Sequence, residues 1–332
     1  MGFLNWTLSQ FVIQTIVHSV VIAIIIEVMI NLWHIQKPSL QMKFRFLVLL
    51  PVIYLPFYFL LYSSRLSAHF HEQVALIDSN AWMKLSLAGG ITIWYLFMAM
   101  LVVTTSFFLV KEAIPSIRYF LTRRSPLPAV EPGQFPKLDL ALVRLARQNY
   151  FRIPKVLLSV EAVPSVHKSA HQALVLSART IDTLDDEELE AVIAHELAHL
   201  TGLNHRLVQI SLILRFLLFY NPMALFIFHR ILDNSEKASD DMAVLVTGGK
   251  LALASAILKV YQLTAPHARP RVSGWRRFIP RINTLESQFY WDLIKERVER
   301  LVHPEEISDI PYANVRVLFV AVLLLALLFF VV

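Results

Sequence analysis

The stretch TLDDEELEAVIAHELAHLTG, residues 183–202, contains two histidines four residues apart, with a glutamate directly after the first. Its acidic residues 185–188 favour a helix N-terminus, because carboxylates stabilise the partial positive charge there. Apolar residues recur along the rest of the stretch, and Gly202 marks its expected end. On such a helix His195 and His199 lie one turn apart and project from the same face. The stretch therefore predicts a helix that presents two imidazoles to one site.

This spacing is the HExxH pattern, in which two imidazoles hold one Zn²⁺ and the glutamate between them, Glu196, acts as general base. A catalytic zinc typically has three protein ligands and one open position. Glu236 is the candidate third ligand, and Asp240 follows one turn later on a helix expected at about residues 222–246, where it can orient a ligating imidazole. The alternatives are half-buried helix histidines and a solvated acidic helix face. We expect one Zn²⁺ per chain.

The composition is that of a membrane protein. Hydrophobic residues make up 56% of the 332 residues and charged residues 17%, which is too apolar for an ordinary soluble domain. With no cysteine in the chain, a metal site must rely on His, Asp and Glu. The formal charge of +6 does not indicate nucleic acid, because much of the basic excess lies beside apolar segments, where it meets lipid headgroups.

Four apolar segments approach or reach the roughly 20 residues that a helix needs to cross a bilayer. They are residues 6–33, 46–62, 85–110 and 312–332. A fifth apolar stretch, 207–232, is interrupted by Arg215 and by Asn221-Pro222, so we expect two helical pieces with Asn221 capping the second. This stretch is expected at the membrane interface or re-entrant, with Arg215 reaching headgroups or a carboxylate, and it is a candidate gate. The alternative is a core segment packed against the spans.

Basic residues set the expected orientation. Lys37, Lys43 and Arg45 lie between the first two spans, and further basic residues follow the third span, so both regions are expected inside. Arg316 can reach the inner headgroups from the last span. The predicted organisation is a three-helix transmembrane region, a cytoplasmic domain that includes the segment 207–232, and a final transmembrane helix, with both termini outside. Their boundaries are 1–110, 111–311 and 312–332.

Two short apolar runs precede the HExxH helix. KVLLSV, residues 155–160, and ALVLSA, residues 173–178, read as strands. We expect residues 173–177 to be an exposed edge strand that pairs with an extended substrate, since such pairing would present a peptide carbonyl to the metal. The alternative is an ordinary strand of the sheet.

These patterns carry a family resemblance. The run from ALVLSA through HELAHL, the later NPMALFIFHRILDNSEKASDDMAVL and IKERVERL at 294–301 resemble membrane-embedded gluzincin metallopeptidases of the BlaR/MecR sensor-transducer (antirepressor) type. The motif pair is also similar to that of CAAX-processing and heat-shock membrane zinc peptidases. The resemblance implies four transmembrane helices and a cytoplasmic α+β zincin domain. It also implies a bacterial inner-membrane location.

The resemblance implies roles for individual residues. His195, His199 and Glu236 match zinc ligands, Glu196 the catalytic base, and Asp240 the carboxylate behind the ligands. Ser239 stands where sensor-transducers often have cysteine, and no catalytic consequence is expected of it. We also expect Arg297 to form a salt bridge with the site carboxylates, whereas His303 is either a further site residue or a loop histidine. Without the extracellular penicillin-binding domain of sensor-transducers, binding of a beta-lactam by that route is not expected.

The sequence thus predicts a membrane-embedded zinc endopeptidase that cleaves protein or peptide substrates at the cytoplasmic membrane face in regulatory proteolysis. Its expected partners are the lipid bilayer, a protein substrate and a sensor or regulator protein, and nucleic acid is not expected. One alternative is a housekeeping quality-control or CAAX-type protease. Another is a non-enzymatic membrane adaptor that keeps a peptidase-like fold.

Overall fold

The computed structural model describes residues 2–55, 93–110, 114, 128–131, 133–147, 154–159, 165–167, 173–199, 202–264, 280–303 and 312–328. The chain is mostly helical with a small sheet, and it divides into two compact units. Unit 1 comprises Met1–Arg124, Leu207–Asn234 and Asp309–Val332, and unit 2 comprises Ser125–Arg206 and Ser235–Ser308. Parts of the expected spans 46–62 and 85–110, namely residues 56–62 and 85–92, lie outside the described residues.

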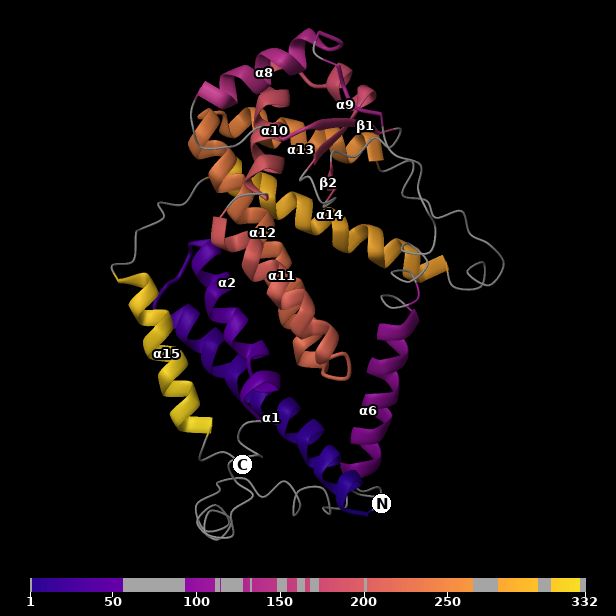
Figure 1. Ribbon diagram of the computed structural model, residues 1–332, viewed down its shortest axis with the longest axis vertical. Helices are drawn as coiled ribbons and strands as arrows, with labels where there is room; N and C mark the ends of the chain where they lie inside the picture. Colours follow the sequence, from indigo (N-terminus) through magenta and orange to yellow (C-terminus); the bar gives the residue numbers. More distant parts are fainter. Residues whose placement is uncertain are drawn as a thin grey trace. The chain divides into compact units, whose positions relative to one another are not determined.

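Unit 1 is a group of apolar helices. They are α1 (Gly2–Leu32), α2 (Pro38–Phe46) with the short 3₁₀ helix η1 (Leu47–Leu49), α6 (Ile93–Phe108), α15 (Ala313–Leu328), most of α11 (Gly202–Leu217) and the first half of α12 (Pro222–Thr247). Helix α1 packs against α2 and η1, and α15 packs against α2, as the indigo and yellow ribbons of Figure 1 show. Their shared core includes Ile26, Phe44 and Leu324.

The outer surface of these helices is also apolar. Val103 on α6 is 67% exposed and Leu318 on α15 is 65% exposed, and α1 and α11 expose further large apolar side chains. The segments Phe11–Leu32 and Pro38–Leu55 are long and apolar enough to cross a membrane, whereas Met98–Phe108 and Ala313–Ala326 are shorter apolar helices. Apolar surface of this extent is typical of contact with lipid, so the chain is a membrane-associated protein.

The region expected between the first two spans is helical from Pro38 onward. Pro38 at the first turn starts α2, because its fixed φ suits that position. Lys43 and Arg45 therefore lie on a helix. Arg45 is buried, and its Nε and Nη2 atoms donate to the Glu27 carboxylate of α1 at 2.8 and 3.1 Å. This bidentate pair neutralises a buried charge and connects α1 with α2.

The turn between α11 and α12 is held by side chains. The Oδ1 atom of Asn221 accepts from the backbone amide of Met223 at 3.0 Å, so the predicted N-cap is confirmed. Its Nδ2 atom donates to Ser19 Oγ of α1 at 3.0 Å. Beside it, the Tyr220 hydroxyl lies 2.9 Å from Thr15 Oγ1. The break in the apolar stretch is thus a turn fixed to α1.

Arg215 does not reach lipid headgroups as expected. The residue is 1% exposed, and its guanidinium carbon lies 5.3 Å from the centre of the Phe108 ring of α6. Burial in the stretch 207–232 is mixed, since Leu214 and Ile227 join the core of unit 1 while Ile213 and Phe226 are exposed. The expected contact of Arg215 with headgroups is wrong, because its side chain is buried among the helices of unit 1.

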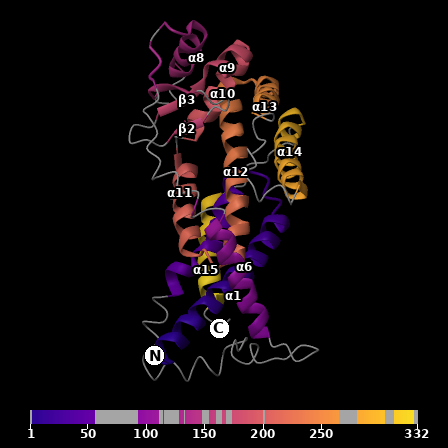
Figure 2. The same cartoon turned by 90° about the vertical axis from the view of Figure 1, so that its right-hand side faces the viewer.

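Unit 2 combines a three-stranded sheet with helices. Its elements are α8 (Pro136–Arg147), β1 (Val156–Ser159), β2 (Ser165–His167), β3 (Ala173–Ser177), α9 (Ala178–Thr183), α10 (Asp186–Ala198), the second half of α12, α13 (Lys250–Thr264) and α14 (Pro280–Val302). Helix α10 packs against α8 and α13, and α14 packs against α13, which lies beside it in Figure 2. The core of the unit includes Leu145, Leu174, Ile193 and Leu253.

The strand order corrects the expectation for residues 173–177. The order is β1-β3-β2, with β1 parallel and β2 antiparallel to β3, so β3 is central and all five of its residues are buried. The other side of β1 is bonded by residues 128–130, where the amide of Val130 donates to the Val156 carbonyl at 3.0 Å. Within the part of the sheet that the structure describes, β2 is therefore the outer strand without a partner on its far side.

Helix α10 begins with a capping box. The side chain of Asp185 accepts from the amide of Glu188 at 2.8 Å, and the Glu188 side chain accepts from the amide of Asp185 at 2.9 Å. The helix ends at Ala198, and Gly202 begins α11 rather than stopping α10. The HExxH residues thus lie at the last turn of α10, with His199 at its C-cap.

Glu188 also links α10 to α13. Its buried carboxylate accepts from Ser255 Oγ and Lys259 Nζ, each at 2.6 Å. Burial acts to raise the pKa of Glu188, but the hydrogen bonds from Lys259 and Ser255 outweigh it and hold the pKa below its usual value. The ionised form therefore stabilises unit 2 above about pH 4.5, and this contribution is lost as the pH falls through the lower folded-state pKa.

We predict that Glu188→Gln lowers the free energy of unfolding by about 2 kcal/mol at neutral pH, because a buried charged hydrogen-bond acceptor is lost while Lys259 keeps some solvent contact. The measurement is thermal unfolding of the full chain in detergent micelles. The difference from the parent should shrink as the pH falls below about 4.5. Glu299→Gln, which removes an exposed carboxylate of α14, is the control and should change little.

Candidate metal centre

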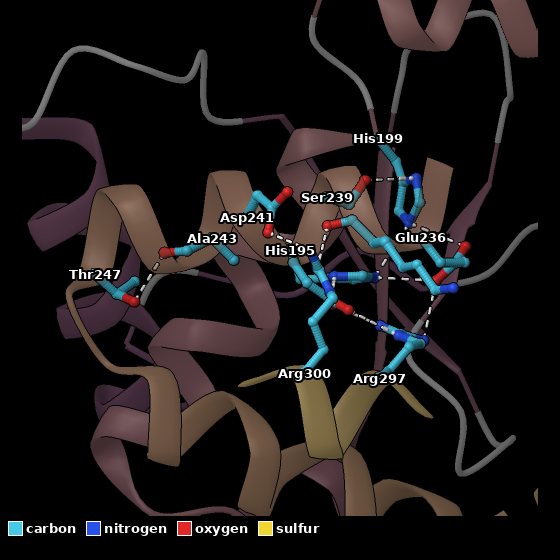
Figure 3. A network of polar contacts seen from close by, with 11 residues as sticks. His195, His199, Glu236, Ser239, Asp241, Ala243, Thr247, Arg297 and Arg300 are labelled. Carbon is cyan, nitrogen blue, oxygen red and sulfur yellow. Dashed lines mark hydrogen bonds and ion pairs between the residues drawn. The ribbon is translucent and has the colours of Figure 1, made fainter. Parts of the chain in front are cut away.

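Two histidines and a glutamate converge in unit 2. The Nε2 atoms of His195 and His199 lie 3.2 Å apart, with the rings nearly perpendicular. Each Nε2 atom lies 3.4 Å from one carboxylate oxygen of Glu236 on α12. Figure 3 shows both imidazoles pointing toward this carboxylate. Three atoms, one from each residue, lie within 4.8 Å of one another and form a group that could hold a metal ion.

The opposite nitrogen of each imidazole faces another residue of α12. His195 Nδ1 lies 2.9 Å from Oδ1 of Asp240, and His199 Nδ1 lies 3.2 Å from Oγ of Ser239 (Figure 3). Both rings are therefore oriented with Nε2 toward Glu236 and Nδ1 toward a polar partner. Metal-binding histidines usually have this arrangement, because the outer hydrogen bond fixes the ring and its tautomer.

Helix α14 supplies cations to the site. Arg297 donates to both carboxylate oxygens of Asp240, at 2.9 and 2.7 Å, and its Nη1 atom lies 3.2 Å from Glu236 (Figure 3). One turn along, Arg300 pairs with Asp241 at 2.8 Å and donates to the Lys237 carbonyl at 2.7 Å. These contacts bind α14 to the turn of α12 that carries the site.

Charges in the cluster shift the pKa values of its members. Burial acts to lower the pKa of His195, but the carboxylates of Asp240 and Glu236 outweigh it and raise the pKa to about 10. Partial burial acts to raise the pKa of Glu236, whereas His195 and His199 hold it well below its usual range. Burial likewise opposes ionisation of Asp240, and the Arg297 guanidinium lowers its pKa. A metal ion would compete with the His195 proton for the same position.

Glu196 lies beside the cluster without entering it. It follows His195 on α10, and burial raises its pKa despite the opposing influence of His195 and His199. A carboxyl group with a raised pKa is suited to accept a proton and later to release it. When ionised, the three carboxylates of Glu196, Glu236 and Asp240 carry three negative charges, and Arg297 carries one positive charge. The group therefore has a formal charge of −2 when the histidines are neutral.

The donor set fits a divalent metal. A tetrahedral Zn²⁺ with bonds of about 2.0–2.1 Å holds its ligand atoms about 3.3–3.4 Å apart. The separations of 3.2 and 3.4 Å among the two imidazoles and the carboxylate agree with that spacing. Two neutral imidazoles with one carboxylate are ligands that zinc accepts, and the excess of carboxylates in the cluster favours a cation.

The sequence of residues 10–279 matches the family described as BlaR1 peptidase M56. The chain belongs to this family. The matched region covers most of the chain and includes His195, Glu196, His199 and Glu236. The expected resemblance to membrane metallopeptidases of BlaR/MecR type is thereby confirmed. No curated protein matches the chain.

In this BlaR1-type peptidase, one of the two further candidate site residues, Arg297, contacts the cluster, and the other, His303, does not. Arg297 reaches the cluster although α14 begins after the end of the family match. His303 is exposed, and in the described residues no contact joins it to the cluster, which agrees with its interpretation as a loop histidine. Sequence reasoning missed the contact of Ser239 with His199 and the pairing of Arg300. Helical spacing could have indicated both contacts, because residues three apart share a helix face. Ser239 lies three residues after Glu236, and Arg300 lies three residues after Arg297.

We expect the purified full chain to bind one Zn²⁺, and His195→Ala or His199→Ala to weaken that binding by more than about 100-fold. Removal of a direct ligand should lower the zinc affinity more than removal of a residue that only hydrogen-bonds to a ligand, which typically lowers it by roughly 10–100-fold. Competition with a chromophoric chelator measures the affinity. His303→Ala is the matched control, since it removes an exposed histidine, and its affinity should equal that of the parent. An equal loss in this control would contradict the ligand assignment.

Proposed function

We propose that this BlaR1-type peptidase is a membrane-embedded, zinc-dependent endopeptidase that cleaves protein substrates at the cytoplasmic face of the membrane. The observation that carries the proposal is the convergence of His195, His199 and Glu236 with an outward partner behind each imidazole. Family membership supports peptidase activity. The apolar surface of unit 1 supports a site tethered to the bilayer.

In this mechanism, His195, His199 and Glu236 would hold the metal. A bound Zn²⁺ would polarise the scissile carbonyl and lower the pKa of a bound water. Glu196 accepts the proton from the attacking water and then delivers it to the leaving amine nitrogen.

Arg297 and Asp240 act on the ligands rather than on the substrate. Arg297 occupies both oxygens of Asp240, and Asp240 in turn faces His195. This chain of contacts keeps the His195 ring in one orientation while Glu196, the next residue of α10, meets the substrate. Orientation of the reacting groups before substrate arrives lowers the entropic part of the barrier.

The substrate is proposed to bind in extended form along β2. This outer strand pairs with β3 through residues 165–167, and its far side has no strand partner among the described residues. An added strand would satisfy its remaining backbone groups. The proposal replaces the earlier assignment of substrate pairing to residues 173–177, because β3 has neighbours on both sides.

The central test is Glu196→Gln. We predict that this variant keeps stoichiometric zinc but loses at least about 1,000-fold in kcat, because the amide cannot accept the proton of the attacking water. The assay uses the full chain in detergent with a library of quenched fluorescent peptides. Glu187→Gln, at an exposed position of the same helix, is the control and should keep full activity. Equal cleavage by the Glu196 variant and the parent would exclude this mechanism.

The biological role proposed is regulatory proteolysis, on the basis of family membership, rather than general clearance of damaged membrane proteins. We predict that the Glu196→Gln variant, expressed in cells and crosslinked, retains one or a few client proteins near the inner membrane face. Mass spectrometry of the retained proteins is the measurement. A broad set of unrelated membrane proteins would instead indicate the housekeeping alternative.

A further inference from the structure

The two metal-facing imidazoles are held by different chemistry. Behind His195 lies a carboxylate, Asp240, which is itself paired with Arg297. Behind His199 lies a neutral hydroxyl, that of Ser239, at 3.2 Å from Nδ1. Both partners come from the same turn of α12. The cluster is therefore asymmetric, with an ionic support on one side and a single hydroxyl contact on the other.

The hydroxyl contact constrains the tautomer of His199. Its Nε2 atom faces His195 Nε2 at 3.2 Å and Glu236 at 3.4 Å, so Nε2 is the atom directed at the metal position. A nitrogen that binds a metal must offer its lone pair, which places the ring proton on Nδ1. The Nδ1–H group then needs an acceptor, and Ser239 Oγ lies within hydrogen-bonding distance.

The position of Ser239 is fixed by the fold. The residue is 6% exposed and lies on α12 between Glu236 and Asp240, both of which belong to the cluster. Because residues three apart on a helix share a face, the helix that presents Glu236 to Nε2 of His199 also presents Ser239 to Nδ1 of the same ring. One helix thereby contacts both nitrogens of His199.

We propose that Ser239 is a positioning residue for His199, and that it sets the tautomer and ring orientation with which His199 binds the metal. This inference rests on the proposed function, because it assumes that His199 is a ligand. Ser239 supports His199 as Asp240 supports His195, but without charge. Its loss should therefore weaken metal binding less than the loss of a ligand and without abolishing folding.

The test compares Ser239→Ala with Ser239→Thr in the full chain. We expect Ser239→Ala to weaken Zn²⁺ affinity by about 10-fold, at the lower end of the range for outer partners, and Ser239→Thr to restore most of it. Affinity is measured by chelator competition. The Co²⁺-loaded proteins give a second readout, in which the visible absorption bands should shift for the Ala variant and return toward the parent for the Thr variant.

The control is Thr247→Val, which removes a hydroxyl from the same helix where it bonds the carbonyl of Ala243 (Figure 3). It should leave both readouts unchanged. If Ser239→Ala binds Zn²⁺ within about twofold of a zinc-binding parent and keeps its Co²⁺ spectrum, the positioning role is wrong while the proposed function stands. If the parent itself binds no zinc, the proposed function fails first.

Discussion

The buried carboxylate of Asp240 is the group on which the geometry of the site depends. The residue is fully buried and contacts His195 of α10 on one side and Arg297 of α14 on the other. An unpaired carboxylate in that position would be costly, so the position of α14 is constrained by the charge of α12. Asp240 thus joins three helices of unit 2 and fixes the orientation of one imidazole in the same contact.

The residues that meet in the candidate site were largely predictable from the sequence, because their grouping depends on spacing within single helices. His195 and His199 share a face of α10, and Glu236 and Asp240 share a face of α12, wherever these helices lie in space. The N-cap at Asn221 was predictable for a similar reason, since capping involves neighbouring residues. The sequence also predicted that Asp240 faces a ligating imidazole and that Arg297 pairs with the site carboxylates, but it did not predict the partner of His199 Nδ1. The pairing of Ser239 with His199 requires the packing of two helices.

Errors in the sequence-based interpretation arose where tertiary neighbours decide the outcome. A short apolar run such as ALVLS predicts a strand but does not distinguish an edge from a centre, and β3 is central because β2, only three residues long, lies outside it. Arg215 looked like an interfacial residue because arginine is rarely buried, yet helices of unit 1 cover it. Arg45 was expected between two spans, yet it lies on α2, where Glu27 of α1 neutralises it within the helix packing.

Placing Glu236, Ser239 and Asp240 on one helix has a mechanical consequence. A helix of 26 residues is about 39 Å long and resists local deformation, so these three side chains move together whenever α12 rotates or slides. The candidate ligand Glu236 and the partners of both histidines therefore keep their mutual register. The first half of the same helix begins at Asn221, which is bonded to α1 in unit 1. Helix α12 therefore contributes its first half to unit 1 and the residues of the candidate site to unit 2.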